Sequence, residues 1–227
     1  MQVAAVVLDL DGTLLDTERV YQHAFMVACG ELGFSTPTGL YGDLVGLPST
    51  ERGALLRRHF GVQFPWQDFL DRYYACRNRM LAGDLPIGAG AIELLDWLDA
   101  RAIPKAVATS ASRSTAETHL MHAGLRDRFG VLVTRDDVSF SKPHPESFLK
   151  AAMALGVAPR RCVGIEDSAP GLSAAIAAGM AVIAVGGQQD PRRFRPMLGV
   201  ARDLHHVRAL LARAIEPALS CNVQPAA

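Results

Sequence analysis

Long apolar runs, blocks of like charge and closely spaced cysteines are all missing from this sequence. No apolar run reaches the ~18 residues that a transmembrane helix needs, so no membrane span is expected. The 23 basic and 23 acidic residues balance over the 227-residue chain. Because they form no extended block of one sign, neither a nucleic acid nor a membrane is expected as a partner.

The four cysteines lie far apart and form no C-x-x-C pair: Cys29, Cys76, Cys162 and Cys221. This spacing argues against a disulfide framework and favours a reducing compartment. The first residues carry no basic segment ahead of their short apolar run, so a signal peptide is not expected. We therefore expect the protein to be cytoplasmic. We also expect it to be globular, because 49% apolar residues suffice for a packed core. The oligomeric state is left open, with a monomer as the working expectation.

An apolar stretch over residues 3–8 leads directly into two carboxylates, Asp9 and Asp11, and then into Gly12 and Thr13. The Val-rich run predicts a strand that is buried on both faces of a parallel sheet. Carboxylates at the end of a buried strand are costly unless a cation meets them, and hard oxygen ligands suit Mg2+. This stretch alone leaves two interpretations open: a metal site, or acids that end a strand and cap a turn.

Residues 16–84 have a helical pattern and contain no strand-like run. Apolar spacing predicts three helices there, near residues 20–32, 49–59 and 66–81. The segment is too long for one crossover between strands, so we predict an inserted helical cap domain over residues 16–85. Residues 12–15 and the stretch near Leu85 and Pro86 are the expected hinges.

From residue 86 onward, short apolar strands alternate with helical patterns. Strands are expected near residues 105–109, 131–134, 162–165 and 181–185. This alternation predicts the α/β class, with a doubly wound, Rossmann-like parallel sheet built from residues 1–15 and 86–227. Ligands of such sheets bind beyond the carboxyl ends of the strands.

Chemically useful side chains follow the expected strands at that edge. Ser110 follows the second strand, Glu166 and Asp167 follow a later one, and Lys142 lies in a loop between them. Lysine is scarce in this chain, since Lys105 and Lys150 are the only others. A lysine in a sequence that otherwise prefers arginine indicates a need for a compact point charge.

The run from Asp9 through Glu18, Asp-Leu-Asp-Gly-Thr-Leu-Leu-Asp-Thr-Glu, resembles the first motif of the haloacid dehalogenase (HAD) superfamily. It is most similar to the branch of small phosphatases and beta-phosphoglucomutase. Ser110, Lys142 and the pair Glu166-Asp167 match the remaining three motifs in order. The resemblance implies a HAD core with a cap domain and an Mg2+-dependent phosphohydrolase. Its expected substrate is a small phosphorylated metabolite, in first place a sugar phosphate.

The resemblance also implies a role for each motif residue. Asp9 would attack phosphorus and form an aspartyl phosphate, and Asp11 would protonate the leaving group and later activate water. Ser110 and Lys142 would bind the transferring phosphoryl group. Mg2+ would be held by Asp9, the backbone carbonyl of Asp11, Asp167 and Glu166, the last directly or through water. The other residues expected near the substrate are Gly12, Glu18, Gly46, Ala111 and Arg113.

Other activities on this fold make different demands on the sequence. A dehalogenase does not need Asp11 or the metal-binding acids, and a phosphonatase needs a cap lysine, of which residues 16–84 contain none. Beta-phosphoglucomutase stays the main alternative because Thr17 matches one of its hinge positions, although Tyr21 stands where it has histidine. A mutase also needs cationic cap groups, and Arg72, Arg77 and Arg79 are candidates. A non-catalytic binding protein is less favoured, because none of the motif acids is missing.

Overall fold

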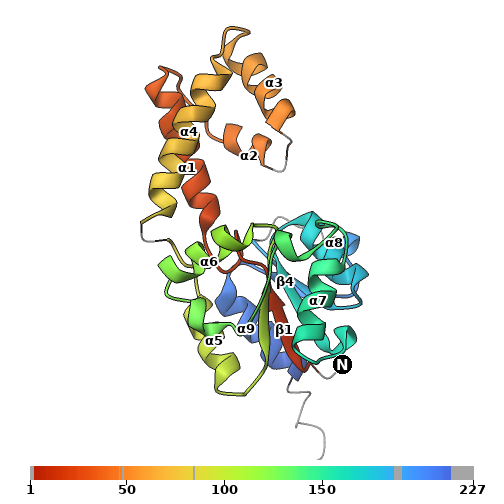
Figure 1. The fold of residues 1–227 in the computed structure, drawn as a ribbon. Helices are drawn as coiled ribbons and strands as arrows, with labels where there is room; N and C mark the ends of the chain where they lie inside the picture. The colour runs from red at the N-terminus through yellow and green to blue at the C-terminus, as the bar shows by residue number, and fades with distance from the viewer. Residues whose placement is uncertain (1–2, 46, 48, 84, 187–190, 216–227) are drawn as a thin grey trace, which may run out of the picture. The chain divides into compact units, whose positions relative to one another are not determined.

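The computed structural model describes residues 3–45, 47, 49–83, 85–186 and 191–215 (Figure 1). The chain divides into two compact units. Met1–Asp16 and Pro86–Ala227 form the first, here called the α/β unit, and Thr17–Leu85 form the second, the helical unit. Within the described ranges no helix is long and apolar enough to cross a membrane. Cys29, Cys76 and Cys162 are free thiols.

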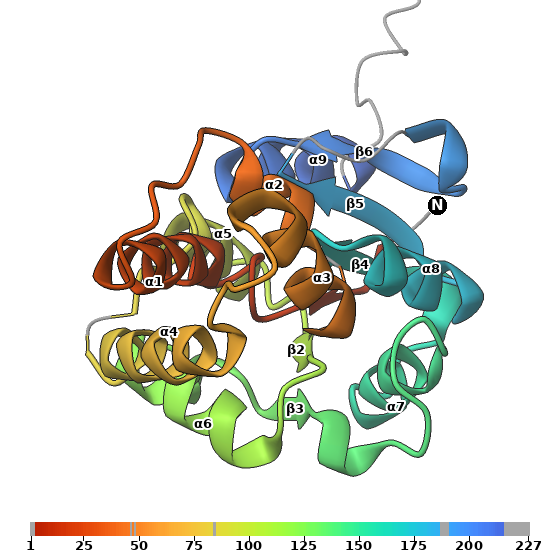
Figure 2. The ribbon, with the colours of Figure 1, turned by 90° about the horizontal axis from the view of Figure 1, so that it is seen from above.

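The α/β unit is built on six parallel strands in the order β3-β2-β1-β4-β5-β6. Strand order runs outward from β1 in both directions, and Figure 2 shows the labelled strands in this succession. The predicted doubly wound parallel sheet is therefore confirmed. The strands are β1 (Ala5–Leu8), β2 (Lys105–Ala108), β3 (Val131–Val133), β4 (Cys162–Glu166), β5 (Ala181–Val185) and β6 (Met197–Ala201).

Helices cover both faces of this sheet (Figures 1 and 2). α7 (Glu146–Ala154) and α8 (Ala169–Ala177) pack on one face, where Phe148 belongs to the same buried apolar cluster as Ala5 and Ala106. α5 (Ala91–Asp99) packs with α9 (Leu204–Ile215), which contacts β5 and β6. The remaining helical segments are α6 (Arg113–His122) and the 3-10 turns η1 (Arg126–Arg128), η2 (Arg135–Asp137), η3 (Pro159–Arg161) and η4 (Pro191–Arg193).

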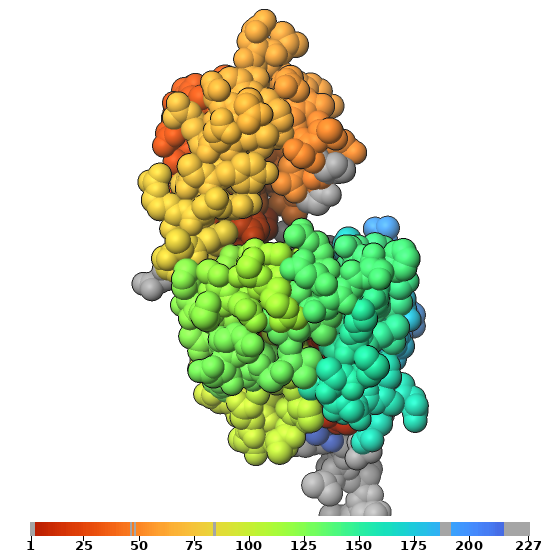
Figure 3. Space-filling model, viewed as in Figure 1, coloured from red at the N-terminus to blue at the C-terminus, as the bar shows by residue number. Residues whose placement is uncertain are grey.

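The helical unit consists of α1 (Thr17–Glu31), α2 (Leu40–Leu44), α3 (Ser49–Phe60) and α4 (Trp66–Leu81). α1 and α4 pack against each other, and Figure 3 shows their side chains adjoining on one face of this unit. Each helix turns an apolar face inward, and aromatic rings make up a large part of the core that these faces form. The buried members of this core are Phe25, Ala28, Cys29, Leu40, Leu44, Leu56, Phe64 and Phe69.

The two segments that lead into and out of the helical unit are hydrogen-bonded to each other within the α/β unit. Asp16 N–H donates to the Pro86 carbonyl over 2.8 Å, and Gly88 N–H donates to the Leu14 carbonyl over 2.8 Å. Leu15 and Ile87 form an isolated antiparallel bridge. Asp16, which we expected to open the insert, therefore belongs to the α/β unit.

Candidate active site

Lys142 joins the ends of three neighbouring strands. Its ammonium group donates to Asp9 Oδ1 after β1, to Glu166 Oε1 at the end of β4 over 2.7 Å, and to the Ala108 carbonyl at the end of β2 over 2.9 Å. Asp9 is held in turn by its own N–H, which donates to the Ile165 carbonyl over 2.9 Å. The structure thus brings together residues that lie far apart in the sequence, because parallel strands present their carboxyl ends at one edge.

The charges of this cluster are coupled inside the protein. Burial raises the pKa of Asp9 well above its usual value; Lys142 opposes that shift, and the charges of Glu166 and Asp167 add to it. Burial would lower the pKa of Lys142, but the charges and hydrogen bonds of Asp9 and Glu166 raise it above the usual value. Lys142 is therefore a permanent cation beside Asp9, as a group that stabilises phosphoryl charge must be.

Asp167 lies against the turn that follows β1. Thr13 Oγ1 donates to Asp167 Oδ1 over 3.1 Å. Burial, followed by the charge of Glu166, raises the pKa of Asp167 to about 7. Gly12 has a φ of +83°, and a Cβ at this position would lie 2.3 Å from Asp167 Oδ2. Only glycine fits there, so the Asp-Gly-Thr sequence builds the turn that receives Asp167.

Both carboxylate oxygens of Glu166 are already hydrogen-bonded. Oε1 accepts from Lys142, and Oε2 accepts from the backbone N–H and the hydroxyl of Ser168, each over 2.8 Å. A Cβ on Gly171 would lie only 1.7 Å from Glu166 Oε1, so the glycine makes room for this carboxylate. These contacts support a role for Glu166 in holding Lys142 and favour a contact with a metal through water over direct ligation.

The donor set of this cluster fits Mg2+. Lys142 donates to Asp9 and to Glu166, and the charge of Asp167 acts on Asp9 beside them. Burial raises the pKa of Asp9 and of Asp167, and the charges of neighbouring carboxylates add to both shifts, so a bound cation would favour their ionised forms. Among the described residues, no three His, Cys, Asp or Glu side chains converge as a complete ligand set. Mg2+ does not require one, because it keeps several waters and takes oxygens from phosphate.

The loop after β2 presents Ser110 as an exposed residue. The Thr109 hydroxyl, next to it, accepts from the Ala111 N–H over 3.1 Å, which shapes the loop. Ser112, not Ser110, caps α6, since its hydroxyl accepts from the Thr115 N–H over 3.3 Å. The Ser110 hydroxyl is therefore not used as the helix cap, and its predicted phosphoryl contact stays a prediction.

Arg113 is committed to a structural network. Its guanidinium donates to Asp137 Oδ2 over 2.6 Å and to the Leu132 carbonyl over 3.2 Å. Its backbone N–H donates to Asp136 Oδ2 over 2.8 Å. These contacts explain Arg113 as a tie between α6 and the segment after β3, and they give no support to its predicted contact with substrate.

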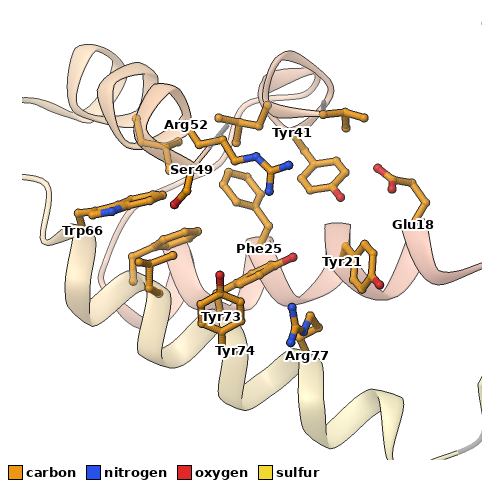
Figure 4. A pocket seen from close by; sticks show the side chains of 15 residues that line it. Glu18, Tyr21, Phe25, Tyr41, Ser49, Arg52, Trp66, Tyr73, Tyr74 and Arg77 are labelled. Carbon is orange, nitrogen blue, oxygen red and sulfur yellow. The ribbon is translucent and has the colours of Figure 1, made fainter. Parts of the chain in front are cut away.

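Glu18 and Gly46, which we expected near the substrate, fall within the sequence of the helical unit. Gly46 lies outside the described residues. Glu18 lies on α1 and lines a cavity of about 340 Å³ that is formed entirely by residues of the helical unit (Figure 4). Its other labelled lining residues are Tyr21, Phe25, Tyr41, Ser49, Arg52, Trp66, Tyr73, Tyr74 and Arg77.

This cavity combines aromatic walls with a few polar groups. Arg52 extends from α3 toward Tyr41 (Figure 4), and its Nε is buried without a hydrogen-bond partner in the described structure. Burial raises the pKa of Tyr41 and of Tyr73, so both hydroxyls stay protonated, and the Tyr41 hydroxyl is hydrogen-bonded to Glu18. The guanidinium carbon of Arg77 lies 4.7 Å from the centre of the Tyr74 ring. Such a lining suits a polar ligand that offers hydrogen-bond acceptors.

His119 was missed by the sequence analysis. It is 4% exposed on α6, and its Nδ1 lies 3.4 Å from Asp11 Oδ1. The spacing of Ala116, His119 and Leu120 places the three on one buried helix face. That spacing could have identified a buried histidine, but the sequence does not indicate which residue it faces.

A family model described as "Haloacid dehalogenase-like hydrolase" matches residues 6–185, most of the chain and all four motifs. The chain belongs to this family. The resemblance and the prediction of a hydrolytic enzyme are thereby confirmed. The match includes the helical unit and begins within β1.

Relatives of this haloacid dehalogenase-like hydrolase include named phosphatases. The fructose-1-phosphate phosphatase YqaB of Escherichia coli (strain K12) is 32% identical over 183 residues, which cover 80% of this chain and 96% of the relative. A HAD family hydrolase from Deinococcus radiodurans R1, solved with bound phosphate and sodium, superposes with a TM-score of 0.81 at 29% identity over 93% of this chain and 96% of that one.

One similar structure represents the alternative activity. It is described as a "putative beta-phosphoglucomutase" from Thermotoga maritima and has a TM-score of 0.73 at 27% identity. It covers 88% of this chain and 94% of its own. The comparisons therefore support an enzyme of phosphate-ester chemistry and leave its substrate open.

Proposed function

We propose that this protein is an Mg2+-dependent phosphatase that hydrolyses a small phosphorylated metabolite, in first place a sugar phosphate, through a phosphoryl group on Asp9. The observation that carries the proposal is the bridge from Lys142 to Asp9 and Glu166, with Asp11 and Asp167 beside it. Such a cluster can bind a phosphoryl group, attack it with a carboxylate and move a proton at the adjacent acid.

The first half-reaction forms the phosphoryl-enzyme. An Asp9 carboxylate oxygen attacks phosphorus, and the bond from phosphorus to the leaving oxygen breaks as that oxygen receives a proton from Asp11. Lys142 holds the Asp9 carboxylate in place and balances negative charge on the phosphoryl oxygens. A bound Mg2+, held by Asp9 and Asp167, would add positive charge at the same oxygens.

The second half-reaction releases phosphate. Asp11, now ionised, takes a proton from a water molecule whose oxygen attacks phosphorus, and the bond between Asp9 and phosphorus breaks. The proton that Asp11 gave to the leaving group is thereby replaced. The net change is hydrolysis of one phosphate ester to an alcohol and inorganic phosphate.

We further propose that the helical unit acts as a cap that selects the substrate. Its cavity has the aromatic surface and hydrogen-bonding groups that suit the organic part of a sugar phosphate. Beta-phosphoglucomutase activity is the second candidate, because Arg52 and Arg77 in the same cavity are cations that a second phosphate could use. Hydrolysis ranks first because Tyr21 occupies the position of the mutase histidine.

Replacement of the proposed nucleophile tests this function. Asp9→Asn should lower Mg2+-dependent phosphate release from a panel of sugar phosphates by at least about 10³-fold, because an amide cannot form the phosphoryl intermediate. Asp127→Asn, at an exposed aspartate in η1, is the matched control and should retain wild-type activity. EDTA should abolish the wild-type reaction.

Two results would contradict the proposal. One is wild-type turnover in Asp9→Asn with an unchanged thermal midpoint. The other is conversion of glucose 1-phosphate to glucose 6-phosphate, in the presence of a bisphosphate primer, at a rate that exceeds phosphate release. The second result would favour the mutase.

A further inference from the structure

A buried histidine faces the proposed acid–base residue, and within the part of the chain that the structure describes neither of the two facing atoms has a hydrogen-bond partner. His119 Nδ1 and Asp11 Oδ1 lie 3.4 Å apart, and both atoms are shielded from solvent. A buried polar atom without a partner is costly, and native structures rarely retain one without a reason. Two such atoms that face each other are most simply satisfied by one hydrogen bond.

The Asp11 carboxyl has two distinct oxygens in this arrangement. Its side chain is 25% exposed, whereas Oδ1 is buried against His119. The exposed part of the Asp11 side chain therefore lies away from Oδ1. Oδ2 is thus the oxygen that can approach a substrate. A contact on Oδ1 would fix the carboxyl plane without occupying the oxygen that reacts.

We propose that His119 is a positioning residue for Asp11: its Nδ1–H donates to Asp11 Oδ1 and aims Oδ2 at the leaving oxygen of the substrate. The inference rests on the proposed function, because it assigns His119 a part in the proton transfer by Asp11. His119 itself neither touches the substrate nor exchanges a proton in the reaction.

The proton path follows from this geometry. The Asp11 proton resides on Oδ2 and passes to the leaving oxygen while the bond from that oxygen to phosphorus breaks and the bond from Asp9 to phosphorus forms. Oδ1 accepts from His119 before and after the transfer. In the second half-reaction the same Oδ2 receives the proton of the attacking water.

The test compares two esters that differ in their need for a proton. A hexose phosphate expels an alkoxide and depends on protonation by Asp11, whereas p-nitrophenyl phosphate expels a stable phenolate and does not. The value of kcat/KM measures the barrier of the first chemical step from free enzyme and substrate. His119→Leu should lower kcat/KM about 10-fold for the hexose phosphate, the scale of one charge-assisted hydrogen bond, and less than about 3-fold for p-nitrophenyl phosphate.

Two further variants separate positioning from packing. His119→Asn keeps an N–H donor near the place of Nδ1 and should recover most of the lost kcat/KM for the hexose phosphate. His122→Leu removes an exposed histidine from the same helix and should leave both reactions at wild-type rates. The thermal midpoint of His119→Leu should not fall much, because leucine suits a buried helix face.

An equal loss with both esters would assign His119 a structural role and overturn the inference. Wild-type kinetics of His119→Leu with both esters would overturn it as well. Failure of the proposed function would look different, because wild-type protein would then release phosphate from neither ester.

Discussion

Three buried ionisable side chains lie together at the carboxyl ends of the central strands of the α/β unit. The side chains of Lys142, Asp9 and Glu166 are 6%, 9% and 1% exposed, respectively. Lys142 offsets the desolvation of both carboxylates, and its own desolvation is offset by them and by the Ala108 carbonyl. Ser168 also donates to Glu166. The proposed catalytic role and the structural role therefore coincide in Lys142.

Removal of Lys142 should damage stability as well as activity. Lys142→Met leaves two buried carboxylates without their cation, and we expect the free energy of unfolding in urea, without added Mg2+, to fall by about 3 kcal/mol. Lys150→Met is the matched control, because Lys150 is 40% exposed; it pairs with Glu146 of α7 and donates to the Asp137 carbonyl. That variant should lose less than about 1 kcal/mol. Equal losses in the two variants would contradict a buried ion pair.

The sequence predicts single residues well where a motif coincides with the end of a strand. The sequence predicted one cluster of Asp9, Lys142 and Glu166, because the carboxyl ends of parallel strands lie at the same edge of a sheet. His119 and the partners of Arg113 could not be predicted in this way. Their contacts depend on the rotation and register of α6 against the sheet, which apolar spacing alone does not determine.

At the scale of elements, Asp137 joins two segments that follow neighbouring strands. Besides Arg113, it accepts from the backbone N–H and the hydroxyl of Thr134, each over 2.7 Å, and thus closes a capping box at η2. The start of α6 after β2 and the turn after β3 are therefore held together by one carboxylate.

This carboxylate should make the α/β unit sensitive to acid. Burial alone would raise the pKa of Asp137, but hydrogen bonds from Arg113 and Thr134 lower it to about 2. The contribution of the ionised Asp137 carboxylate to the free energy of unfolding is therefore complete above the unfolded-state pKa of ~4, and it is lost as the pH falls through about 2. Asp137→Asn should cost about 1 kcal/mol at pH 7, because the pair is partly exposed. In urea titrations, the difference in the free energy of unfolding between Asp137→Asn and wild type should shrink toward pH 2.

The matched control for this prediction is Asp127→Asn, at an exposed aspartate in η1. Its difference from wild type should be small and nearly independent of pH. A difference for Asp137→Asn that stays constant between pH 7 and pH 2 would show that the carboxylate charge does not act on stability.

The elements that the sequence predicted are those with strong periodicity or dense apolar runs. β6 was missed because Met197-Leu198-Gly199-Val200-Ala201 contains an interior glycine and one β-branched residue. Tertiary packing explains the glycine in this strand, because a Cβ on Gly199 would lie 2.8 Å from Leu210 Cδ1 of α9. α2 was missed because five residues are too few to show a helical period.

At the scale of the whole molecule, the proposed chemistry and the proposed selection of substrate belong to two units with separate cores. The proposed reacting groups lie in the α/β unit, and the aromatic cavity lies in the helical unit. The length of residues 16–85 predicted a separate helical unit. It did not predict the cavity, because side chains from α1, α2, α3 and α4 line that cavity together. If the helical unit is a cap, a change in its cavity should affect the choice of substrate more than the chemical step.

Arg52 provides the test of that division, because its buried Nε lacks an acceptor that a substrate could supply. Arg52→Met should lower kcat/KM for the preferred sugar phosphate by about 10- to 100-fold, the range for one or two hydrogen bonds to a charged group. Hydrolysis of p-nitrophenyl phosphate, which lacks the sugar hydroxyls, should stay within about 3-fold of wild type. Arg58→Met, at an exposed arginine of α3, should change neither. Equal losses on both esters in Arg52→Met would assign Arg52 to the stability of the helical unit instead of to substrate choice.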